Sequence, residues 1–162
     1  MLAFLSYQTG DRYVAGEIGS FLDKIGVRRF MAHESINVSR KWQEEILCNL
    51  DKADLFIAIL SARYLESPYC LQESGIAVFA GKPIIPLAID RTTPPGFMAH
   101  IQSRNIQPKA LDGQMLLASI AEFDRPTLID CLIERFNESG SYAEAAENFE
   151  RLEPYLKNAD DL

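Results

Sequence analysis

The first candidate for a chemically active side chain is the carboxylate of Glu73. The apolar periodicity predicts a helix over residues 68–80, in which Glu73 borders a narrow face of small residues. Its neighbours three and four positions along that helix carry no charge, so none of them can form a helix-surface ion pair with it. Two interpretations stay open from the residues alone: the carboxylate points into a cleft, or it is solvated at the rim of the packing face.

Three other features can contribute to a binding site, and each has a structural alternative. The loop at residues 31–39 is either a binding loop or a plain connector, and its polar side chains are His33, Glu34, Ser35 and Asn37. Trp42, one turn into the next helix, either stacks on a planar ligand or belongs to the core. Tyr7, at the end of the first predicted strand, either lines a site or closes the sheet.

Composition argues against several kinds of site. The net charge of −7 and the lack of a basic stripe predict no binding of nucleic acid. His33 and His100 have no cysteine or second histidine at ligand spacing, so no metal site is expected. The cysteines, Cys48, Cys70 and Cys131, indicate free thiols in a reducing compartment, the cytoplasm. No apolar run is long enough to span a membrane, and residues 1–6 do not resemble a signal peptide.

The elements that position these side chains alternate between strands and helices. Buried strands are predicted at residues 2–7, 27–30, 55–60 and 84–89, with a short edge strand at 105–107. Residues 55–60 are apolar at every position, which is typical of a central strand buried on both faces. The alternation predicts a parallel sheet with helices on both faces, whose ligands bind outside the carboxyl ends of the strands.

The ends of the helices carry recognisable signals. Asp11, Ser39 and Ser67 are predicted N-caps. Gly26 is predicted to end its helix in a left-handed conformation, and Gly81 is predicted to stop the helix before it. Further helices are expected at 115–123 and 127–136, on either side of a break at residues 125–126. Residues 1–138 are expected to form one domain, and residues 139–162 an acidic helical extension or the start of a linker.

Five segments, in order and at consistent spacing, resemble motifs of the TIR (Toll/interleukin-1 receptor) domain family. They are residues 4–7 (FLSY), Arg29-Phe30 with the loop up to Trp42, residues 53–61, residues 64–73 and residues 81–87. The fourth segment fits a Y-x-x-S-x-[W/Y]-C-x-x-E pattern that ends on Glu73. The resemblance covers residues 2–137. The chain differs from many family members in having no glycine at residues 37–41, just before Trp42.

The resemblance implies a fold, an activity and a set of site residues. The fold is a flavodoxin-like five-stranded parallel sheet with strand order 2-1-3-4-5 and helices on both faces. The activity is that of bacterial NAD-cleaving TIR domains, which release nicotinamide and ADP-ribose or a cyclic ADP-ribose variant in prokaryotic immune, anti-phage signalling. NAD⁺ is then the substrate, no cofactor is needed, and Glu73 is the catalytic residue. The implied substrate-binding residues are Ser6, Tyr7, Phe30, Ser35, Trp42 and Cys70.

Two other functions remain alternatives at this point. The first is a non-catalytic module that associates with other TIR domains, and the second is an enzyme similar to nucleoside deoxyribosyltransferases. The resemblance also implies self-association with other TIR protomers through the loop at residues 31–41, without nucleic acid or membrane as a partner. Glu73 beside an open cleft would favour an enzyme over a module.

The loop at residues 31–41 generates a prediction about assembly. It combines apolar Met31, Ile36 and Val38 with polar residues, a mixture suited to partner contact. If protomers stack to complete one another's sites, the NAD⁺-cleaving rate per molecule rises with protein concentration. Ile36→Asp should abolish that rise, measured as nicotinamide release over a wide concentration range. A flat rate per molecule in both proteins would rule out a shared site.

Overall fold

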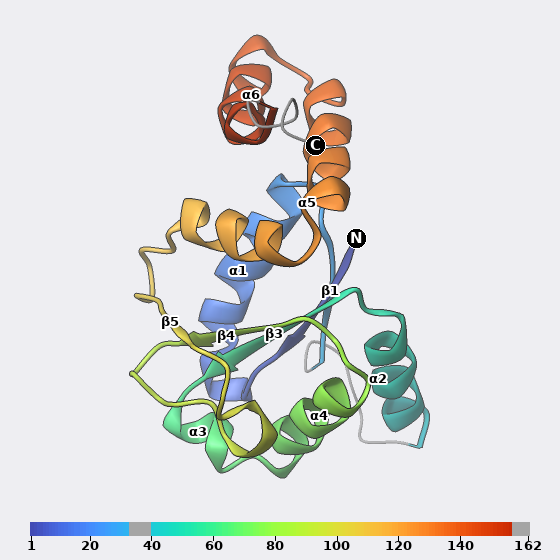
Figure 1. Cartoon of the computed structure of the whole chain (residues 1–162), viewed down its shortest axis with the longest axis vertical. Coiled ribbons are helices and arrows are strands. Elements are labelled where there is room, and N and C mark those ends of the chain that lie inside the picture. The colour runs from blue at the N-terminus through green and yellow to red at the C-terminus, as the bar shows by residue number, and fades with distance from the viewer. Residues whose placement is uncertain (33–39, 157–162) are drawn as a thin grey trace.

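The sheet is all-parallel and five-stranded, with the order β2-β1-β3-β4-β5 that was predicted (Figure 1). The computed structural model describes residues 1–32 and 40–156, with only the backbone described at residues 40–42. The loop that includes Ser35 and Ile36, and the side chain of Trp42, therefore lie outside the described residues. The strands are β1 (Leu2–Ser6), β2 (Arg28–Met31), β3 (Leu55–Leu60), β4 (Ile84–Ala88) and β5 (Arg104–Asn105).

The central strand is β3, and all six of its residues are buried. It pairs in parallel with β1 on one side and β4 on the other, with Phe56 opposite both Phe4 and Ile84. The prediction of a central strand buried on both faces is confirmed. β5 pairs only with Leu87 and Ala88. Pro86 thus precedes the part of β4 that pairs with β5, and among the described residues no strand lies beside it on that side, a position that tolerates a residue without an N–H.

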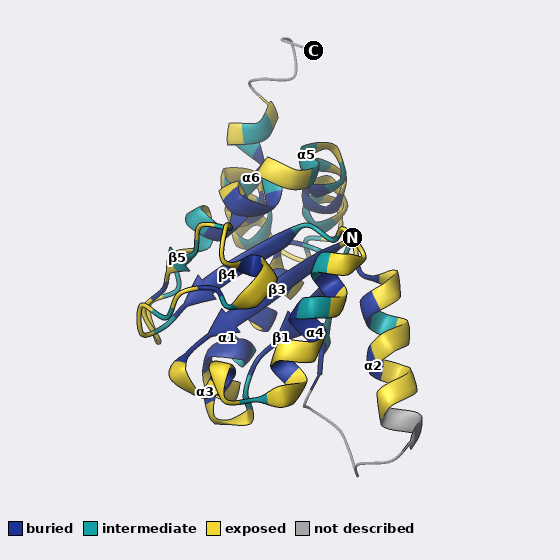
Figure 2. Cartoon of the chain, turned by 60° about the horizontal axis from the view of Figure 1, so that its bottom comes forward, coloured by how far each residue is buried: buried dark blue, intermediate teal, exposed yellow. Residues whose placement is uncertain are grey.

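Helices cover both faces of the sheet, as predicted (Figure 2). They are α1 (Arg12–Lys24), α2 (Arg40–Lys52), α3 (Ala62–Leu65), α4 (Pro68–Phe79), α5 (Gly113–Asn137) and α6 (Tyr142–Leu156), with short 3₁₀ turns η1 (Thr9–Asp11) and η2 (Gly96–Met98). One core joins the sheet to α1 and α5, and it takes Ala3 and Leu5 of β1. The other joins the sheet to α2, α3 and α4, and it takes Phe4. Because successive side chains of a strand point to opposite faces of the sheet, β1 contributes residues to both cores.

The structure differs from the predictions in two local details. The four-residue helix α3 was not predicted, and its N-cap Ser61 accepts a hydrogen bond from the backbone N–H of Tyr64 at 3.1 Å. Asp11 stands at the N-cap position of α1, but its side chain makes no capping bond. Its carboxylate instead accepts hydrogen bonds from Ser61 Oγ at 2.5 Å and Arg63 Nη1 at 2.7 Å. Asp11 therefore ties the start of α1 to α3 rather than capping a helix.

The C-terminal helices follow the predicted pattern. α5 contains one non-helical residue, Asp124, immediately before Arg125 and Pro126, so the predicted break is confirmed. Asp124 Oδ1 accepts the backbone N–H of Thr127 at 3.1 Å and so caps the second half of α5. The helix α6 packs on that half, with Leu152 buried in the core. The boundary proposed at residue 138 stays a prediction. None of the described helices is long and apolar enough to cross a membrane.

Two glycines that end helices offer a matched test of packing. Gly26 follows α1 with φ +75° and Gly81 follows α4 with φ +64°. A Cβ on Gly26 would lie 2.8 Å from the carbonyl oxygen of Cys131, whereas a Cβ on Gly81 would meet nothing within 4 Å. Gly81→Ala should lower the free energy of unfolding by roughly 1 kcal/mol, the cost of a left-handed alanine. Gly26→Ala should cost clearly more in urea denaturation. Equal losses would show that α5 shifts freely away from this turn.

Candidate functional site

Glu73 is buried against the sheet and not solvated, because it is only 3% exposed. It sits in the second turn of α4. That helix begins where the sequence predicted, with Ser67 accepting a hydrogen bond from the backbone N–H of Cys70 at 3.4 Å and Pro68 at the first helical position. The inner face of α4 consists of the small residues predicted for it, among which Cys70 and Ala77 are fully buried. This lets the helix approach the sheet closely enough for Glu73 to reach β1.

The two oxygens of the Glu73 carboxylate have different surroundings. Oε2 accepts a hydrogen bond from Ser6 Oγ at 2.5 Å, and Ser6 is the last residue of β1 and fully buried. Oε1 is buried and has no hydrogen-bond partner among the residues that the structure describes. A buried acceptor without a partner costs free energy, so its retention points to a functional role.

A cluster of hydroxyl groups surrounds the Ser6 end of this contact. Tyr64 OH, from α3, lies 3.0 Å from Ser6 Oγ and 2.7 Å from Ser74 Oγ. Both Tyr64 OH and Ser74 Oγ can donate to the carbonyl oxygen of Cys70, at 3.3 and 2.7 Å. Three elements, β1, α3 and α4, thus meet in one buried polar network beside Glu73.

Burial dominates the electrostatics of the site. It raises the pKa of Glu73 to about 7, against a smaller lowering by the Ser6 hydroxyl. It also raises the pKa of Cys70 to about 11, and that of Tyr64 above its ordinary value. At neutral pH the thiol and the phenol therefore keep their protons, and Glu73 is the group that changes charge. Cys70 is consequently a poor nucleophile here.

A hollow of about 280 Å³ lies between α2 and α4, with Glu73 in its wall. Its other lining residues are mostly apolar, with two amides: Gln43, Ile46, Leu47, Tyr69, Gln72 and Ile76. This volume corresponds to about nine water molecules, which is room for one ring system but not for a whole dinucleotide. The hollow can therefore hold a base against the carboxylate while the rest of a nucleotide lies outside it.

The structure places the residues suggested by the sequence in three groups. Ser6 and Cys70 lie with Glu73 in the polar network, and both are fully buried. Tyr7 is fully buried in the core on the α1 side of the sheet, the opposite side from α4. Phe30 is half-buried and packs on Phe4 with ring centroids 5.3 Å apart. The side chains of Ser35 and Trp42 lie outside the described residues.

Tyr64 was not named as a site residue from the sequence. The sequence placed it at the end of residues 61–64, near the expected ligand-binding edge of the sheet, and at the start of the Y-x-x-S segment, without giving it a role. Its contact with Ser6 joins residues 58 positions apart, and no local pattern predicts such a contact. Across the described part of the chain, no group of three or more histidine, cysteine, aspartate or glutamate side chains could hold a metal ion.

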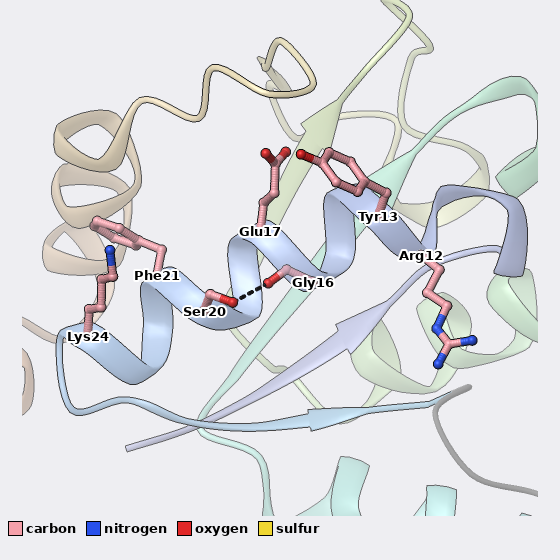
Figure 3. Close-up of a pocket in the computed structure, with 7 residues that line it drawn as sticks. All are labelled: Arg12, Tyr13, Gly16, Glu17, Ser20, Phe21 and Lys24. Carbon is pink, nitrogen blue, oxygen red and sulfur yellow. Dashed lines mark hydrogen bonds between the residues drawn. The ribbon is translucent and has the colours of Figure 1, made fainter.

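A second hollow, of about 720 Å³, lies along the outer face of α1 (Figure 3). It is lined from Arg12 to Lys24, and the Arg12 side chain points away from the Glu17 carboxylate. Ser20 Oγ donates to the carbonyl of Gly16 at 2.8 Å, a bond within the helix. Tyr13 and the other charged or polar side chains here are at least partly exposed. Although larger, this hollow lacks the buried polar group that distinguishes the one beside Glu73.

Comparison with known proteins assigns the chain to a family. The sequence pattern of the TIR domain matches residues 3–116. The chain belongs to the TIR domain family. Its fold is similar to the crystal structure of the TIR domain of the Toll-related receptor TRR-2 from Hydra magnipapillata, with TM-score 0.57 and 18% identity over 80% of this chain and 96% of that one. Domains of this family associate with other TIR domains.

A second solved structure with a similar fold is the Clostridium botulinum CMP N-glycosidase BcmB. Its TM-score is 0.51, with 18% identity over 76% of this chain and 100% of that one. No curated protein matches the chain. Identities this low show a shared fold, so the argument for activity depends on the site of this TIR domain itself.

The raised pKa of Glu73 predicts how the stability of the fold depends on pH. Between pH 4.5 and about 7, the carboxyl ionises in the unfolded chain but stays protonated in the folded one, which destabilises the fold by up to about 3 kcal/mol. Above pH 7 the full penalty remains. Glu73→Gln removes it, so the variant should melt several degrees higher than the parent at pH 8 and nearly equally at pH 4. Glu66→Gln, at an exposed position, should show no such difference. A destabilised Glu73→Gln at pH 8 would contradict this account.

Proposed function

We propose that this TIR domain cleaves the N-glycosidic bond of NAD⁺, with Glu73 as its catalytic residue. The products are nicotinamide and either ADP-ribose or a cyclic ADP-ribose variant, and the role is in prokaryotic immune, anti-phage signalling. The observation that carries the proposal is a buried carboxylate with one oxygen held by Ser6 and the other without a described partner, beside a hollow of nucleobase size. Such a carboxylate costs stability and is suited to a charge that appears only during reaction.

One carboxylate is sufficient for this chemistry. Nicotinamide leaves with the electron pair of the glycosidic bond and becomes a neutral ring, so no general acid is required. The ribose left behind carries positive charge as an oxocarbenium-like species, which the carboxylate of Glu73 stabilises. Water then bonds to the anomeric carbon and releases a proton, giving ADP-ribose. A nucleophilic atom of the adenosine part in place of water gives a cyclic product.

Two further observations support an enzyme over a module that only binds other TIR domains. A purely structural helix has no need of a carboxylate buried without a cation partner among the described residues, because an apolar residue there would be more stable. The fold is also similar to that of a protein named as an N-glycosidase of CMP, and this likeness supports the proposal of N-glycosidic cleavage. Self-association through residues 31–41 remains part of the proposal, with other TIR protomers as partners.

The proposal is tested by following nicotinamide release from NAD⁺ with concentrated purified protein. Glu73→Gln should lower the rate by at least ~10²-fold, since it removes a charge that acts in the transition state. The parent rate should rise about tenfold per pH unit below pH 7 and level off above it, because the ionised carboxylate is the active form. The rate for Glu66→Gln should equal that of the parent.

CMP provides the comparison substrate. Release of cytosine without cleavage of NAD⁺ would keep Glu73 as the catalytic residue and overturn the choice of NAD⁺. An unchanged NAD⁺ rate in Glu73→Gln would overturn the assignment of Glu73. No cleavage of either substrate at any concentration or pH would favour the non-catalytic interaction module.

A further inference from the structure

We propose that Ser6, Tyr64 and Ser74 are positioning residues that form a reversible hydroxyl relay, which orients Glu73 and sets its state of ionisation. The relay runs from Glu73 Oε2 through Ser6 Oγ, Tyr64 OH and Ser74 Oγ to the carbonyl oxygen of Cys70, with separations of 2.5, 3.0, 2.7 and 2.7 Å. The inference deepens the proposed function and rests on it only for its effect on the reaction. The arrangement of the relay itself is independent of any substrate.

In the ionised state, the hydroxyl groups of the relay can all donate toward the carboxylate. Each hydroxyl has one hydrogen to donate. Ser6 gives its hydrogen to Oε2, so its own oxygen is left to accept from Tyr64 OH at 3.0 Å, with the protonated Cys70 thiol as a weaker donor beside it. Tyr64 in turn accepts from Ser74 Oγ at 2.7 Å. All three dipoles then point toward the negative charge, and each bond polarises the next.

The same chain of contacts serves the protonated carboxyl when every bond reverses. The carboxyl now donates from Oε2 to Ser6, Ser6 donates to Tyr64, and Tyr64 donates to Ser74. Ser74 gives its hydrogen to the Cys70 carbonyl, which can accept because a carbonyl oxygen has two lone pairs. No hydroxyl of the relay is left without a donor role in either state. The Cys70 carbonyl is thus the terminal acceptor that lets the site gain a proton without moving a heavy atom.

The relay also separates the roles of the two carboxylate oxygens. Oε2 is occupied by Ser6 in both protonation states, whereas Oε1 has no partner among the described residues. Oε1 therefore keeps its acceptor positions for a substrate group, which reaches this buried atom only after a side chain in the wall of the hollow moves. A carboxylate fixed through one oxygen cannot rotate freely, so the unoccupied oxygen keeps a constant direction.

The other groups that face Glu73 do not replace the relay. The titratable ones are the Tyr64 phenol from α3, the Cys70 thiol from α4, and the Tyr69 phenol in the wall of the hollow. From β1 comes Ser6 and from α2 come Gln43, Ile46 and Leu47, none of which titrates. No described ion pair includes Glu73. The hydroxyl of Ser6 is the single described hydrogen-bond donor to its charge, so removing it should have a measurable effect.

The hydroxyl of Ser74 could also have a purely structural role. Serine in a helix often donates to the carbonyl four residues earlier, and Ser74 does so to Cys70. Ser119 on α5 makes the same bond to Met115 at 2.9 Å, is also buried, and lies outside the relay. Ser119→Ala is therefore the matched control for Ser74→Ala: it removes an equivalent hydroxyl and an equivalent bond without touching the network.

The test is a ¹³C NMR titration of the glutamate side-chain carboxyls in the full chain from pH 5 to 9, with Glu73→Gln identifying the resonance. Ser6→Ala should move the midpoint of Glu73 upward by about one pH unit or more, the equivalent of one hydrogen bond to a charged group. Tyr64→Phe and Ser74→Ala should move it upward by successively smaller amounts. Ser119→Ala should leave it unchanged, and Ser6→Thr, which keeps the hydroxyl, should keep the parent midpoint.

These outcomes separate the relay from the proposed activity. The titration needs no substrate, so a protein that cleaves nothing still tests the relay. If NAD⁺ is cleaved, the pH–rate midpoint of Tyr64→Phe should move upward together with the NMR midpoint. A lower rate without any shift of the midpoint would mean structural damage and would contradict the relay. Midpoints unchanged in both Tyr64→Phe and Ser74→Ala, or equal shifts in Ser74→Ala and Ser119→Ala, would overturn the relay.

Discussion

The site depends on the hydrogen bond between Ser6 and Glu73. This bond holds a carboxylate at the end of β1 and offsets part of the free energy that its burial costs. Removing a carboxylate from water is expensive, and the bond from a buried hydroxyl offsets only part of that cost. The strand β1 can supply it because its side chains alternate: Phe4 enters the apolar core on the α4 side, and Ser6, two residues on, faces the same side. One polar residue at the strand end thus replaces what would otherwise be core.

The helix α4 is built in the reverse of the usual amphipathic order. Its inner face has small residues, including Cys70 and Ala77, while Leu71 and Phe79 are exposed, the latter at 95%. Small inner residues reduce the apolar area that the helix buries, so its packing contributes less than that of α1, whose inner face has Ile18 and Leu22. The small residues let the helix approach the sheet closely, which brings Glu73 within hydrogen-bond distance of Ser6. The helix therefore loses some packing free energy, and Glu73 is held in position.

The sequence specified those features whose causes are local. Four features act within a few residues, and each was predicted. They are the unbroken apolar run of residues 55–60, the left-handed Gly26, the Ser67-Pro68 helix start and the break before Pro126. The contacts of the Asp11 side chain were not predicted, since its bonds to Ser61 and Arg63 depend on α3, a helix too short to show a periodicity. Glu73 became a candidate because no neighbour on its helix can pair with it, and the resemblance to the TIR motif made it the expected catalytic residue. The role of Tyr64 and the direction of the network were not predicted, because hydroxyl contacts over 58 residues form only once the sheet has assembled.

The burial of Glu73 has an evolutionary consequence. A substitution that replaces this carboxylate with a neutral or apolar residue removes an uncompensated desolvation penalty from the fold. Under the proposed function, drift toward a catalytically silent domain would therefore lower the folding free energy, and selection for the proposed reaction would have to oppose it. A lineage released from that selection could keep the scaffold and its surfaces while losing the reaction in a single step. Binding-only and catalytic members of one fold then differ by what selection maintains, not by what folding requires.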